Sequence, residues 1–97
     1  MDTIKIKNLN IGTSTNMEGC ALKLALMPYF KDGNPVCVSF SETTPMSSSF
    51  FNSSFGELID EYGYKTFKEI VSVSDITKSH FELIKKYISW QKDMVFA

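Results

Sequence analysis

Alternating hydrophobic and polar residues mark two β-strands in this chain, and a β-branched run marks a third. Between Thr3 and Leu9, Ile4 and Ile6 alternate with lysines, which predicts a half-exposed strand at the edge of a sheet. The stretch from Val36 to Ser41 alternates in the same way, and the small side chains on its second face predict a central strand that lies under a helix. The run Ile70 to Ser74 predicts a third strand.

The segment between the first two strands has the three-to-four-residue period of a helix. Thr15 stands three residues before Glu18, as a capping box requires, so a first helix is expected from Met17 to Phe30. Pro28 cannot donate to the helical ladder, and the helix should therefore stop or kink near it. Apolar residues fall on more than one face, which predicts a helix that is covered on more than one side.

Two more helices are predicted after the central strand. The second has an apolar stripe that ends at Gly63, where a left-handed cap residue is favoured, and one of the serines Ser47 to Ser49 is expected to cap its first turn. The third begins after a cap at Thr77 and runs to about Trp90, whereas residues 94–96 are too few for periodicity to decide. The stripe of the second helix comprises Phe51, Phe55, Leu58, Ile59 and Tyr62.

Strands that alternate with helices imply βαβ crossovers. The predicted fold class is therefore α/β, with a small, mostly parallel β-sheet and about three α-helices packed against it. The 97 residues are expected to form a single domain, residues 1–97, with little room for an interior catalytic cavity.

Composition and charge exclude several classes of partner. The net charge is −1 and all ten basic residues are lysine, so neither nucleic acid nor an anionic membrane is an expected partner. No apolar stretch approaches the ~20 residues needed to span a bilayer. The first residues lack a charged segment followed by an apolar run, so we expect no secretory signal. Cys20 and Cys37 match no redox or zinc spacing and are expected to be buried thiols. A cytoplasmic location is the natural expectation.

No catalytic constellation is recognisable. His80 is the only histidine and is expected to be exposed in the first turn of the third helix. The glycines fit no nucleotide-binding motif, so we expect no enzyme activity, no cofactor and no metal site. The acidic residues Glu57, Asp60 and Glu61, late in the second helix, are either a solvated face or an acidic docking edge.

The serines Ser47 to Ser49 lie where the central strand gives way to the start of a helix. The unpaired amides of a helix N-terminus stabilise a phosphate, so a modified serine would be well placed there. The alternative is that one serine caps the helix and the others fill a loop.

The stretch from Val36 to Gly63 resembles the STAS-like domain family of unknown function, which is related to bacterial anti-sigma factor antagonists. Relatives follow this strand with a Met-Asp-Ser-Ser-Gly turn, and the run from Met46 to Phe50 occupies the same place, with Ser47 and Phe50 instead of Asp and Gly. The segment Ile70 to Ile84 is similar to the next strand and helix. The resemblance implies a STAS-like fold.

The resemblance also implies a function. In antagonists this turn and the following helix face a histidine-kinase-like ATPase that binds the domain and phosphorylates it, and STAS-like family members are often found beside or fused to such ATPases. The implied phosphorylation candidate is Ser48, and the implied partner-binding residues are Ser47, Ser48, Ser49, Asn52 and Glu57. The chain itself is expected to be a monomer or a weak homodimer.

A different class of function stays open at this point. The N-terminus of the second helix would also suit a nucleotide or another small anion, which would make the chain a small-ligand binding domain.

Overall fold

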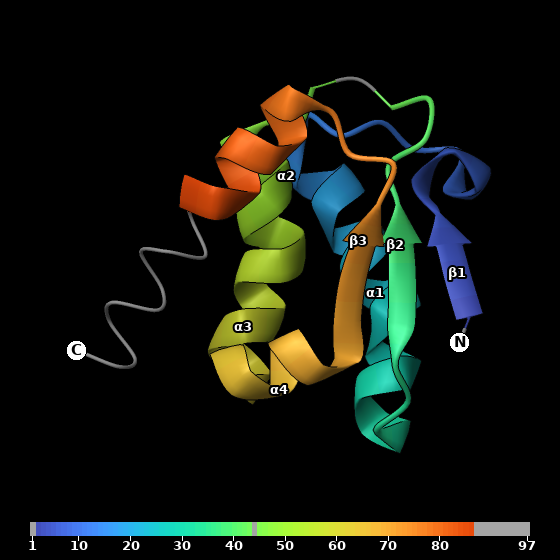
Figure 1. Ribbon diagram of the computed structural model, residues 1–97, viewed down its shortest axis with the longest axis vertical. Helices are drawn as coiled ribbons and strands as arrows, with labels where there is room; N and C mark the ends of the chain where they lie inside the picture. The colour runs from blue at the N-terminus through green and yellow to red at the C-terminus, as the bar shows by residue number, and fades with distance from the viewer. Residues whose placement is uncertain (1, 44, 87–97) are drawn as a thin grey trace.

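A three-stranded parallel sheet forms the centre of the computed structural model, which describes residues 2–43 and 45–86 (Figure 1). The strands are β1 (Asp2–Lys5), β2 (Val36–Ser39) and β3 (Val71–Ser74), and they lie in the order β1-β2-β3. Both pairings are parallel, with Val38 level with Ile4 on one side and with Val73 on the other. The parallel sheet, the edge position of the first strand and the central position of the second strand confirm the sequence prediction.

Helical segments connect the strands and follow the last one. A short 3-10 helix follows β1, one long helix leads to β2, and two helical stretches lie between β2 and β3. A final helix begins at residue 78 and is described to residue 86; the predicted end of this helix near Trp90 and the segment 94–96 lie outside the described residues. The named segments are η1 (Ile6–Leu9), α1 (Asn16–Asp32), α2 (Ser48–Phe51), η2 (Asn52–Gly56), α3 (Glu57–Tyr62) and α4 (Tyr64–Ile70).

The core lies between one face of the sheet and the helices. Val36 and Val38 of the central strand are fully buried, as are Leu22 and Leu26 of α1, which runs behind the sheet in the view of Figure 1. Phenylalanine rings from α2, η2 and α4 complete this core, and the rings of Phe55 and Phe67 meet edge to face at 5.2 Å. Burial of large apolar side chains is the main force that holds these layers together.

Helix α1 departs from the sequence prediction in length and in burial. It continues through Pro28 to Asp32 and ends in a left-handed cap at Gly33. Because proline has no N–H group, the carbonyl group of Leu24 has no helical partner. Leu24 and Pro28 are both exposed, so water can solvate this carbonyl group. The expected cover on a second side is wrong for the described residues, because Met17 and Leu24 are exposed. The predicted burial of Cys20 is also wrong, because Cys20 is exposed. Cys37 is only half-buried.

Two boundaries also differ from the prediction. The first strand is shorter than Thr3 to Leu9, because the chain turns at η1 and thereby buries Ile6 completely. Residues 64–70 form α4 rather than a lead into the third strand, and α4 buries Phe67 and Ile70 on one side. Only Ile70 of the β-branched run belongs to α4, and the rest of that run forms β3 as predicted.

The segments α2, η2 and α3 follow one another without a break, and η2 has π-helical hydrogen bonding. The buried Ser54 hydroxyl in η2 donates to the Phe50 carbonyl oxygen at 2.7 Å. Helix α1 approaches this region closely at Gly19, where an added Cβ would lie 2.6 Å from the Phe50 carbonyl oxygen and 2.8 Å from Ser53 Cβ. Only glycine allows the two helices to be this close.

Because of this close approach, we expect Gly19→Ala to lower the free energy of unfolding by about 1–3 kcal/mol. The steric overlap of the added methyl group costs more free energy than alanine gains in helix propensity. Gly56→Ala is the matched control, since its Cβ would lie 3.4 Å from its nearest neighbour atom, the Phe51 carbonyl oxygen. Urea denaturation measures both free energies of unfolding. Equal stability of the two variants would contradict this account of the α1 contact.

Candidate functional site

The loops that follow the carboxyl ends of the three strands gather at one end of the sheet (Figure 1). This end is the usual location of binding residues in parallel α/β folds. The loop after β2 leads into α2 and contains the serine turn, which we define as Ser47, Ser48 and Ser49. The loop after β3 leads into the final helix.

Ser47 is the cap of α2, which resolves the choice among the three serines. Its hydroxyl accepts a hydrogen bond from the Phe50 amide at 3.1 Å and donates one to the Ser14 carbonyl at 2.8 Å. Its own amide donates to the Thr13 carbonyl at 2.9 Å. Ser47 therefore fastens the start of α2 to the loop that precedes α1, whereas Ser48 and Ser49 are exposed.

The loop beneath Ser47 is itself held by a capping box at the start of α1. The Thr15 hydroxyl accepts from the Glu18 amide, and the Glu18 carboxylate accepts in return from the Thr15 amide at 3.1 Å. The same carboxylate also accepts from the Gly12 amide and from Ser14. The hydroxyl of Thr15 and these amides favour the ionised form, which lowers the pKa of Glu18 below its ordinary value.

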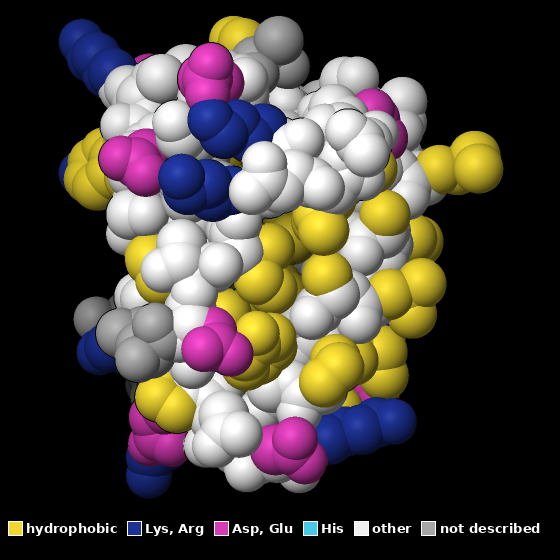
Figure 2. All heavy atoms as spheres, turned by 90° about the vertical axis from the view of Figure 1, so that its right-hand side faces the viewer, with side chains coloured by type: hydrophobic (Ala, Val, Ile, Leu, Met, Phe, Trp, Pro, Cys, Tyr) yellow, Lys and Arg dark blue, Asp and Glu magenta, His cyan; other side chains and the backbone are white. Residues whose placement is uncertain are grey.

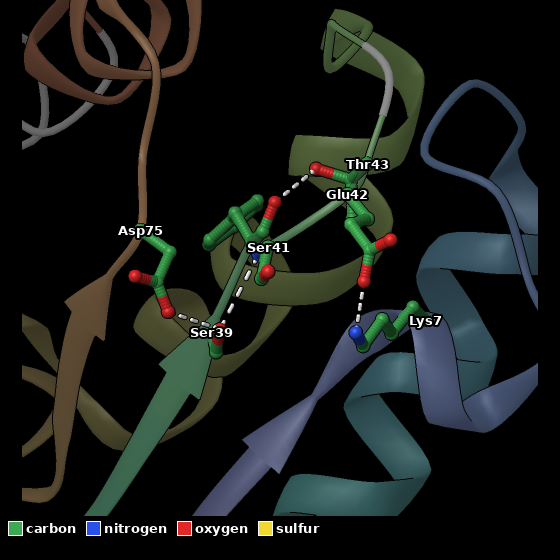
Figure 3. A network of polar contacts seen from close by, with 7 residues as sticks. Lys7, Ser39, Ser41, Glu42, Thr43 and Asp75 are labelled. Carbon is green, nitrogen blue, oxygen red and sulfur yellow. Dashed lines mark hydrogen bonds and ion pairs between the residues drawn. The ribbon is translucent and has the colours of Figure 1, made fainter.

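A polar network joins the ends of the three strands (Figure 3). The hydroxyl of Ser39, at the end of β2, donates to Asp75 Oδ2 at 2.6 Å and accepts from the Ser41 amide at 3.3 Å. Lys7 forms an ion pair with Glu42 and lowers the pKa of that carboxyl group. The network therefore ties the loops after β1 and β3 to the loop after β2.

Glu42 and Asp75 both adopt left-handed backbone conformations, with φ of 59° and 56°. A left-handed conformation costs a residue other than glycine about 1 kcal/mol, although Asp tolerates it better than most. Each side chain is held by a residue from another element, Glu42 by Lys7 of η1 and Asp75 by Ser39 of β2. Nothing in the sequence pattern alone indicated Lys7, Glu42 or Asp75.

His80 is fully buried, so the expectation that it is exposed is wrong. Its Nδ1 accepts from the Thr77 amide at 3.1 Å, its Nε2 lies 3.3 Å from the Thr43 hydroxyl, and its ring packs on Phe40 with centroids 5.0 Å apart. Because Nδ1 accepts, the neutral ring carries its proton on Nε2. The signal in the sequence was a Thr cap with His three residues later, where a capping box has Glu.

The other predicted binding residues lie beyond the serine turn, along the continuous helical rod formed by α2, η2 and α3. Asn52 is exposed one turn after Ser48, and Glu57 is exposed at the start of α3. Lys23 of α1 lies 3.7 Å from Glu57 and 3.6 Å from Glu61, which offsets their charge. Asp60 is exposed.

Within the described residues, no group of His, Cys, Asp and Glu side chains is placed to hold a metal ion. Among those residues there is likewise no helix with the length and apolar character needed to cross a membrane.

One comparison with known proteins identifies a relationship. The family model described as a STAS-like domain of unknown function matches residues 22–81, which is more than half of the chain and includes the serine turn. The match confirms the resemblance drawn from the sequence. No curated protein and no solved structure matches the chain significantly.

The lowered pKa of Glu18 predicts how stability depends on pH. A carboxyl group whose pKa is depressed by folding stabilises the fold above its unfolded-state pKa and loses that effect as pH falls through the folded-state pKa. We therefore expect Glu18→Gln to lower Tm at pH 7 and to lower it less at pH ~3. Asp60→Asn, at an exposed position, is the control. A difference between wild type and Glu18→Gln that stays constant with pH would contradict the assigned role.

The buried contacts of His80 predict that His80→Leu destabilises the protein by ~2 kcal/mol, because the Thr77 amide and the Thr43 hydroxyl lose a partner. Phe81→Leu, at the adjacent exposed position, should change the free energy of unfolding by less than ~0.5 kcal/mol. Urea denaturation near pH 7 measures both. Wild-type stability in His80→Leu would show that these hydrogen bonds do not hold the loop.

Proposed function

Because the chain belongs to the family of STAS-like domains of unknown function, we propose that it is a regulatory module that binds another protein and catalyses no reaction. The proposed partner is a histidine-kinase-like ATPase, as the resemblance to anti-sigma factor antagonists implies. The proposed contact surface comprises Ser47, Ser48, Ser49, Asn52 and Glu57.

The observation that carries this proposal is the division of roles within the serine turn. Ser47 is half-buried and engaged on three sides, so it holds the turn in place. Ser48 is exposed at the first position of α2, where another protein has access to its hydroxyl. A hydrogen-bonded turn that exposes serine hydroxyls is suited to recognition by a kinase, because little order is lost on binding.

A phosphate on Ser48 is the proposed switch. It would lie at the start of the helical rod formed by α2, η2 and α3, where the helix dipole favours negative charge. The hydrogen bonds from Ser47 to Thr13 and Ser14 bring the N-terminal region of α1 close to the same place. The added charge would alter the contact surface without requiring a change of fold.

The acidic residues Glu57 and Asp60 extend this surface beyond the turn. Glu57 keeps about half of its side chain exposed although it is ion-paired with Lys23. Exposed acidic side chains beside the serine turn favour a partner with basic residues, mainly by raising the association rate.

The test is to incubate the purified chain with ATP and the histidine-kinase-like ATPase encoded nearest to its gene, and to measure intact mass and complex formation. We expect one added phosphate in the wild type and in Ser49→Ala, and none in Ser48→Ala. Ser49→Ala is a matched control because Ser49 is the exposed neighbour of Ser48.

A stable complex without phosphate would support the binding module and remove the switch. The absence of both phosphate and complex would overturn the proposal. A higher Tm with a free nucleotide in that case would favour the small-anion alternative.

A further inference from the structure

The outward side of α1 is apolar and uncharged over most of its length. Met17 keeps 84% of its surface exposed and Leu24 keeps 67%. The only charged residues between Met17 and Phe30 are Glu18, which bonds back to the preceding loop, and Lys23, which faces α3. We define the outer stripe as Met17, Cys20, Ala21, Leu24, Met27, Pro28 and Lys31.

Figure 2, which views the molecule from its β1 side, shows a broad band of hydrophobic side chains that few charged side chains interrupt. The outer stripe spans about 21 Å of helix, since each residue adds 1.5 Å. An exposed apolar strip of this kind on a small protein marks a contact surface.

The outer stripe has a projecting end and a hollow end. Met17 projects near the start of α1. The second half of the helix borders a shallow hollow of about 410 Å³, which is lined by Leu24, Met27, Pro28, Lys31 and Asp32. The projection and the hollow lie on the same helix, separated by two to three turns.

We propose that the outer stripe binds the outer stripe of a second copy of this chain, with the two α1 helices antiparallel. Met17 of each copy then fills the hollow of the other copy. Leu24 of each copy fits between Cys20, Ala21 and Leu24 of the other.

A twofold axis explains why the occupant is a second copy. In a symmetric dimer one surface must be complementary to itself, so a projection and a hollow on one helix satisfy both halves of the contact at once. The outer stripe also has the spacing of knobs-into-holes packing. Residues 24, 27, 28 and 31 of one copy surround a hole, and in the antiparallel pairing Met17 of the other copy enters it.

Electrostatics agree with the antiparallel arrangement. The two helix dipoles then run in opposite directions, which is the favourable orientation. Lys31 and Asp32 at the rim of the hollow carry opposite charges, so the rim brings no net charge to the other copy.

The size of the contact sets the strength of the dimer. A single pair of helices buries on the order of 400 Å² on each copy, about half of what a stable complex of standard size buries. We therefore expect a weak, transient dimer rather than a permanent one. The inference does not depend on the proposed ATPase partner.

Sedimentation analysis over a concentration series tests the dimer. The wild type and Phe81→Lys should dimerise equally, because Phe81 is exposed on the final helix and lies outside the stripe. Met17→Lys and Leu24→Lys should weaken dimerisation at least about tenfold. A wild type that stays monomeric at ~2 mM, or dimerisation unchanged in both stripe variants, would overturn the proposal.

Disulfide trapping tests the arrangement. Under mild oxidation Leu24→Cys should form a covalent dimer through Cys20 of the other copy, because facing residues in such a pair approach closely enough for a disulfide. Phe81→Cys is the control and should form no link to Cys20. Peptide mapping identifies the linked residues, and a covalent dimer without a link between positions 24 and 20 would overturn the antiparallel pairing.

Discussion

The contact between α1 and the rod formed by α2, η2 and α3 determines the position of nearly every other element. Gly19 lies so close to the Phe50 carbonyl that any side chain would separate the two helices. With the helices at this distance, Leu22 and Leu26 are buried in the same core as the valines of β2, and Lys23 reaches the carboxylates of α3. One position without a side chain therefore fixes the thickness of the helical layer and the alignment of its polar pairs.

The same contact brings the starts of the two helices together. Ser47 bonds to the loop before α1, and that loop is fixed in turn by the carboxylate of Glu18. The serine turn is thus supported by two caps that share a loop, rather than by one helix alone. On the other side of the turn, Thr43 and His80 connect the loop after β2 to the final helix. Ser48 is exposed beside this hydrogen-bonded base.

The sequence predicted most of the fold, because alternation and helical period report directly on which side chains are buried. The central strand was found in this way, and the residue types at Thr15 and Thr77 predicted two of the caps. For the cap of α2 the sequence left three serines open, and only the structure selects Ser47. Helix α4 was missed because its β-branched neighbours suggested a strand. The outward face of α1 was misjudged because periodicity shows which residues are apolar and not whether another element covers them. Contacts between distant loops, such as that of Asp75 with Ser39, leave no periodic trace.

The π-helical segment η2 also has a consequence for the direction in which α3 faces. A π turn contains one residue more than an α turn, and one residue of an α-helix corresponds to a rotation of about 100°. The extra residue thus resets the angular phase of the rod halfway along its length. It allows Phe50 and Phe51 before it and Leu58 and Ile59 after it to point into the same core. Without the extra residue, α3 would turn its acidic side away from Lys23 and would also turn Leu58 and Ile59 away from the core. The π turn therefore couples the buried face of α3 to its charged face.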